Sequence, residues 1–64
     1  MLIKRNDQYE LHANLTPYDN QFSLALSQVW PKAQHPHTRQ VFQVLLTADE
    51  LVNFAAFLAN ETSQ

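Results

Sequence analysis

The side chains best suited to chemistry gather in one stretch, residues 30–40, which reads WPKAQHPHTRQ. His35 and His37 stand two positions apart, so both could reach one metal ion if the chain is extended there. A zinc site usually takes three or four protein ligands with supporting hydrogen bonds. The stretch contains no carboxylate, and the whole chain has no cysteine. We therefore expect no metal ion and no other cofactor.

Nucleophilic catalysis has little support in the sequence. His12 and Ser23 could meet across neighbouring strands, but no third residue is placed to orient the histidine, and no G-x-S-x-G motif occurs. Glycine is absent, which excludes the phosphate-binding loops of the Walker and dinucleotide types. We expect a protein that is not an enzyme.

The charges are unevenly distributed along a chain whose formal net charge is −2. No acidic residue occurs in residues 21–48, which contain Lys32, Arg39 and two of the three histidines. Single-stranded nucleic acid is bound by aromatic rings that stack on bases and by cations that follow the backbone. Trp30 with these cations fits that pattern, and a first hairpin could bring Lys4 and Arg5 near them. The alternative is that Trp30 closes one end of the core. The chain has only four Lys and Arg residues, which allow few phosphate contacts per subunit.

Alternation of apolar and polar residues predicts four strands, and a helix follows the last of them. The strand periods cover residues 2–5, 9–15, 22–26 and 38–46, with turns at residues 6–7 and 16–20 and a loop at residues 31–37. A phase slip at Gln28 suggests a bulge or a strand end. Thr47 and Glu50 have the spacing of a capping box, which predicts a helix over residues 48–60.

These elements predict an α+β domain with an antiparallel sheet of three to four strands and one C-terminal helix packed on one face, in ββββα order. It forms one domain over residues 1–64, with a frayed tail at residues 61–64. The predicted core consists of Tyr9, Leu11, Leu15, Phe22, Leu24, Leu26, Phe42, Val44, Leu46, Leu51, Phe54 and Leu58.

The core of so short a chain is small. A domain of about 60 residues removes only about 60% of its unfolded surface from water, and no disulfide can add stability here. We therefore expect a homodimer, with Phe57 as a contact because it projects roughly 120° from the apolar stripe of the helix. No apolar run approaches the ~18 residues that cross a bilayer. We expect no membrane contact and a cytoplasmic protein of bacterial or phage origin.

Four strands, the basic stretch VWPKAQHPHTRQ and a helix opened by LLTADEL resemble the single-stranded-DNA-binding domain of the positive transcriptional coactivator family. The resemblance implies a homodimer whose paired sheets form a groove for single strands. The Lys-Gly element that enters the family's final strand is replaced here by RQVFQV, where Arg39 could supply one cation. The family is also markedly basic, whereas this chain is acidic.

Two hypotheses for function follow. The first is a non-catalytic binding module, acting as a homodimer, whose main partner is a protein held by the mild Ser, Gln and Asn surface of the sheet. The second is a single-stranded nucleic-acid-binding protein that uses residues 30–39 and the edge of the sheet.

Overall fold

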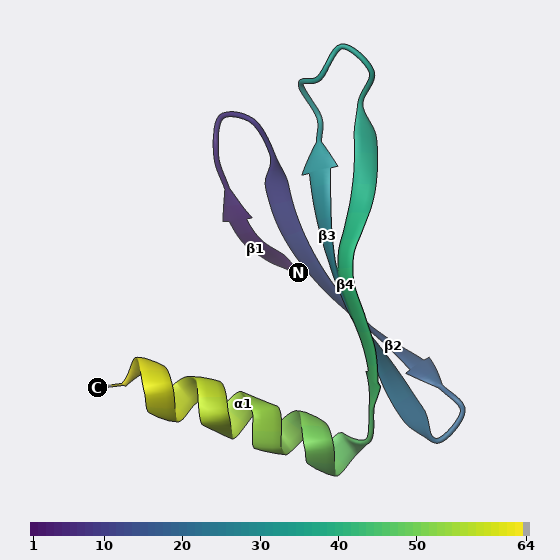
Figure 1. Ribbon diagram of the computed structural model, residues 1–64, viewed down its shortest axis with the longest axis vertical. Coiled ribbons are helices and arrows are strands. Elements are labelled where there is room, and N and C mark those ends of the chain that lie inside the picture. The colour runs from purple at the N-terminus through teal and green to yellow at the C-terminus, as the bar shows by residue number, and fades with distance from the viewer. Residues whose placement is uncertain (64) are drawn as a thin grey trace.

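The computed structural model describes residues 1–63, which form one antiparallel sheet followed by one helix (Figure 1). The strands are β1 (Leu2–Arg5), β2 (Glu10–Tyr18), β3 (Gln21–Trp30) and β4 (His37–Leu46), and they lie in the order β1-β2-β3-β4. The helix is α1 (Ala48–Thr62). The predicted α+β class and ββββα order are confirmed.

The β2–β3 hairpin is longer than the sequence suggested. Its turn is only Asp19 and Asn20, with Asp19 at φ 52°, so the prediction of a five-residue turn at residues 16–20 was wrong. Two-residue hairpin loops favour positive φ, and without glycine an aspartate or asparagine takes that role. Pro17 lies inside β2 opposite Phe22. Proline is tolerated there because β1 pairs only with the first residues of β2, which leaves Pro17 on a free edge.

The irregularity expected at Gln28 lies instead in β4. Leu26 pairs with Phe42 and Ser27 with Gln40, so Val41 is the extra, unpaired residue of a bulge. β3 itself runs without a break to Trp30. Two adjacent apolar residues at the end of β3 therefore do not mark a change of phase, because Val29 simply lies on the other face of the sheet from Trp30.

Strand pairing sorts the side chains onto two faces. Directly paired residues share a face, so one side carries the rows Leu15–Leu24–Val44 and Ala13–Leu26–Phe42. We call this side the apolar face; it comprises Met1, Ile3, Leu11, Ala13, Leu15, Phe22, Leu24, Leu26, Phe42, Val44 and Leu46. The opposite side is the polar face. It carries Arg5, Glu10, His12, Asn14, Ser23, Ala25, Ser27, Gln40 and Gln43, together with the apolar residues Leu2, Val29 and Leu45.

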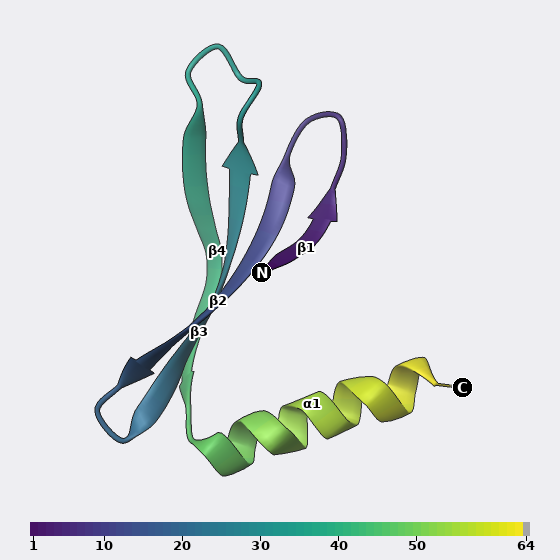
Figure 2. The same ribbon diagram turned by 180° about the vertical axis from the view of Figure 1, so that it is seen from behind.

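The helix starts one residue after β4 and is fixed at its start by the predicted capping box. The Thr47 amide donates to Glu50 Oε1 (2.8 Å), and the Glu50 amide donates to Thr47 Oγ1 (3.2 Å). α1 continues to Thr62, so Glu61 and Thr62, expected in a frayed tail, are helical; Gln64 lies outside the described residues. Seen from either side, α1 leaves the foot of β4 and runs away from the sheet (Figure 2).

The sheet and the helix do not enclose a core. None of residues 1–63 is buried, and four of the twelve predicted core residues are outright exposed: Leu15, Phe42, Phe54 and Leu58. The helix approaches the sheet mainly at β4. The radius of gyration is 14.1 Å, against about 10.7 Å for a compact chain of this length, and the molecule is 14 Å thick in its short direction. The predicted residues lie on the right face, but a single chain leaves that face uncovered.

Candidate functional site

An aromatic row crosses one end of the apolar face. The Trp30 ring lies 5.0 Å from Tyr9, centroid to centroid, and is stacked on His37 at 5.8 Å. Lys4 extends this row, with its Nζ 5.7 Å from the centre of the Tyr9 ring. Residues from near the end of β1, the end of β3 and the start of β4 therefore meet here, together with Tyr9 just before β2. We call Lys4, Tyr9, Trp30 and His37 the aromatic row.

The loop between β3 and β4 lies beside this row. His37 Nδ1 is 3.0 Å from the carbonyl oxygen of His35, and both side chains are solvent-accessible. Lys32 and Trp30 line a shallow hollow of about 410 Å³, whose other side is Asp7 and its neighbour in the β1–β2 turn. Trp30, Lys32 and His37 are thus brought to one end of the sheet, as the sequence suggested, with a carboxylate among them.

Arg39 and Arg5 have different surroundings. Arg39 pairs with Gln28, which places it on the same side of the sheet as Trp30. Arg5 pairs with Glu10 on the polar face, and its Nε lies 2.8 Å from Glu10 Oε2. The expectation that Arg5 joins the cations around Trp30 was therefore wrong. A register shift between Leu2 and Lys4 puts Lys4, and not Arg5, on the side of the sheet that carries Tyr9 and Trp30.

Sequence reasoning placed Tyr9 in the core and not at this site. Tyr9 could have been assigned to the site, because it continues the alternation that runs through Leu11. The sequence named both Lys4 and Arg5 as cations near Trp30 and could not separate them, because the side of the sheet that each occupies depends on the irregularity in β1.

Glu10 links the only charged contacts on the polar face among the described residues. Its Oε1 is 3.0 Å from His12 Nε2, and its other oxygen accepts from Arg5. The hydrogen bond with His12 has the largest effect and lowers the pKa of the Glu10 carboxyl below its ordinary 4.5. Desolvation opposes this shift, and the hydrogen bond and charge of Arg5 and the charge of His12 add to the lowering. His12 is paired across the strands with Ser27, and Ser23 with Thr16, so no His12–Ser23 pair forms.

The rest of the polar face is neutral. Gln43 donates from Nε2 to Ser23 Oγ (2.9 Å), and Gln40 donates to Gln43 Oε1 (3.2 Å). The first bond joins β4 to β3, and the second joins two residues of β4, so both place amide groups at the surface. Such a surface offers hydrogen-bond donors and acceptors without a strong field, which suits a protein partner better than a polyanion.

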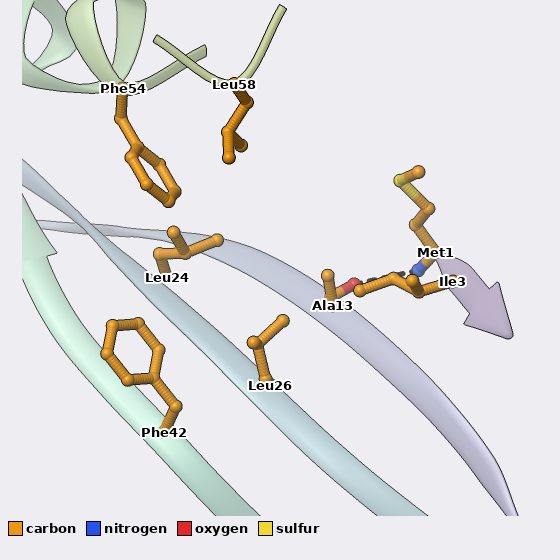
Figure 3. Close-up of a pocket in the computed structure, with 8 residues that line it drawn as sticks. All are labelled: Met1, Ile3, Ala13, Leu24, Leu26, Phe42, Phe54 and Leu58. Atoms are coloured by element: carbon orange, nitrogen blue, oxygen red, sulfur yellow. Dashed lines mark hydrogen bonds between the residues drawn. The ribbon is translucent and has the colours of Figure 1, made fainter. Parts of the chain in front are cut away.

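An apolar hollow lies between the apolar face and α1 (Figure 3). Its volume is about 470 Å³, and every residue that lines it is apolar: Met1, Ile3, Ala13, Leu24, Leu26, Phe42, Phe54 and Leu58. Phe54 points from the helix toward Leu24 without closing the space. A smaller hollow of about 240 Å³ shares Leu24, Phe42 and Phe54 and continues toward Leu46. Water in these hollows would find almost no polar partner.

Residues 1–63 contain no group of three His, Asp or Glu side chains arranged to hold a metal ion. No helix in this part of the chain has the length and apolar character needed to cross a bilayer. Comparison of the chain with protein-family models, curated proteins and solved structures finds no match in any of the three.

Proposed function

We propose that this chain is a non-catalytic binding module that acts as a homodimer and whose main partner is a protein. The observation that carries the proposal is the uncovered apolar face. The chain exposes 5236 Å², whereas a compact folded monomer of its 7.4 kDa would expose about 4,200 Å². The excess of about 1,000 Å² per chain is close to the ~800 Å² that each partner buries in a standard protein interface.

The exposed apolar side chains support a partner rather than a solvated surface. Phe42 is 46% exposed and Phe54 43%, and both line a hollow with no polar wall. Monomeric proteins rarely leave a contiguous apolar patch of several hundred Å² open to water. A second copy has the same apolar face, so one symmetric contact covers the apolar faces of both chains.

In such a dimer the polar face stays free for another protein. This face consists largely of Ser, Gln and Asn side chains, with one cluster of ionisable residues formed by Arg5, Glu10 and His12. The second half of β2, beyond the reach of β1, is also a free strand edge that can pair with an extended segment of a partner. Recognition then rests on neutral hydrogen bonds and strand addition.

A second candidate, single-stranded nucleic acid, is favoured by the aromatic row. Lys4 and Arg39 lie on the same side of the sheet as Trp30, and Lys32 lies beside it. Tyr9 and His37 already stand against the Trp30 ring, which restricts the surface left for a base. Three cations per chain also limit the number of phosphate contacts, so we place this function second.

Two measurements test the proposal. Sedimentation equilibrium at micromolar concentration should give twice the chain mass, and a monomer at every concentration would reject the homodimer. A pull-down with the tagged protein from its native host should recover a protein partner that survives nuclease treatment. Loss of all bound material after nuclease treatment would reject a protein partner in favour of nucleic acid.

Titration of a fluorescent single-stranded oligonucleotide tests the second candidate. Binding should weaken steeply with salt, and Arg39→Ala should reduce the slope of log affinity against log salt by about 0.7. A Gln40→Ala variant, on the polar face, serves as the control.

A further inference from the structure

The hollow lies between the sheet and α1, which are joined by a very short connection. Thr47 is the only residue between Leu46 of β4 and Ala48 of α1. The amide and hydroxyl of Thr47 are held by Glu50 in the capping box, so Thr47 belongs structurally to the start of the helix. In this orientation α1 leaves the hollow open, and apolar side chains of a second chain could fill it.

The helix itself is apolar on more sides than one sheet can cover. Its main stripe contains Leu51, Phe54, Ala55 and Leu58. At ~100° per residue, Val52 projects about 110° to one side of that stripe and Phe57 about 110° to the other. Val52 is 66% exposed and Phe57 57%. A helix that only covers its own sheet needs one apolar stripe, whereas a helix inside an assembly has apolar groups on several sides.

We propose that the two copies of the dimer exchange helices: α1 of each chain lies against the apolar face of the other and places apolar side chains in the hollow of that copy. The two helices then lie together between two sheets, and each is covered on more than one side. The contact is isologous, because each chain gives its helix and receives one. The surface excess of about 1,000 Å² per chain is the area available for it.

This inference rests on the proposed homodimer, so its test separates the exchange from dimerisation itself. The chain has no cysteine, and pairs of introduced cysteines can therefore report contacts without background. Ala13→Cys lies on the apolar face and Ala55→Cys on the helix; both substitutions are small. A disulfide requires Cα atoms within about 7 Å. In a single chain α1 meets the sheet mainly at β4, so this pair on β2 and α1 reports the partner's helix.

The two single-cysteine variants are unfolded together, refolded and oxidised gently. We expect a covalent heterodimer, identified by mass spectrometry, as the main product. Ser27→Cys on the polar face, mixed with Ala55→Cys, is the matched control and should give no heterodimer. A second pair, Ile3→Cys with Leu58→Cys, covers the case in which the first pair disturbs folding, which circular dichroism checks.

The outcomes are distinct. Heterodimer from either pair supports helix exchange. If sedimentation shows a dimer but neither pair crosslinks between chains, the exchange is overturned and the homodimer stands. If a variant carrying both cysteines forms only an intrachain disulfide, the helix covers its own sheet and the exchange is again overturned. If sedimentation shows a monomer, both proposals fail.

Discussion

Leu24→Ala measures directly whether the apolar face is covered in solution. Leu24 lies in the middle of β3, paired with Leu15 and Val44, and borders both apolar hollows. The substitution removes three carbon atoms, worth about 2.4 kcal/mol when the side chain is fully buried, at ~0.8 kcal/mol each. The cavity left in a packed interface raises the loss to about 3 kcal/mol or more per chain. In an isolated chain, where Leu24 is only half-buried, the loss should be near 1 kcal/mol.

Urea unfolding followed by circular dichroism distinguishes the two cases. It should be run at two chain concentrations that differ about a hundredfold. For a folded dimer in equilibrium with unfolded chains, this difference adds about 2.7 kcal/mol to the apparent stability at the higher concentration, from RT ln 100. Val29→Ala, on the polar side of the same strand, is the control and should cost under about 1 kcal/mol. A loss near 1 kcal/mol for Leu24→Ala, with midpoints that do not depend on concentration, would refute a covered apolar face.

Three further predictions concern the helix and the polar face. Thr47→Ala should lower stability by about 1 kcal/mol in urea unfolding because it removes the cap of α1, while Thr47→Ser should keep most of that stability. Phe57→Ala should weaken the dimer about fivefold or more in sedimentation, as loss of an interface aromatic costs at least ~1 kcal/mol, while Asn53→Ala should leave it unchanged. Glu10→Gln should lower stability at pH 7, since the carboxylate is held by His12 and Arg5. Because the folded pKa of Glu10 is below 4.5, the difference from the original protein should be complete above that pH and vanish as the pH falls through the lower folded value. A constant difference from pH 7 to pH 2 would contradict this account.

The sequence alone predicted the order of elements and the two faces of the sheet. In a strand, successive side chains point to opposite faces, so the alternation through Leu11 and Leu24 fixed which residues share a side before any pairing was known. The start of α1 was also predictable, because the capping box of Thr47 and Glu50 depends only on local spacing. The gathering of Trp30, Lys32 and His37 followed from their position on and beside one connection.

Only the tertiary structure decided how those faces are used. The register shift in β1 determines that Lys4 lies by Tyr9 while Arg5 binds Glu10 on the other side of the sheet. The bulge at Val41 places Arg39 on the same side as Trp30. The open hollow under α1 could not be read from the residues, because apolar periodicity shows that a surface avoids water but not which chain covers it. In a single chain the helix turns away from the sheet after Thr47, and the apolar face stays uncovered (Figure 2).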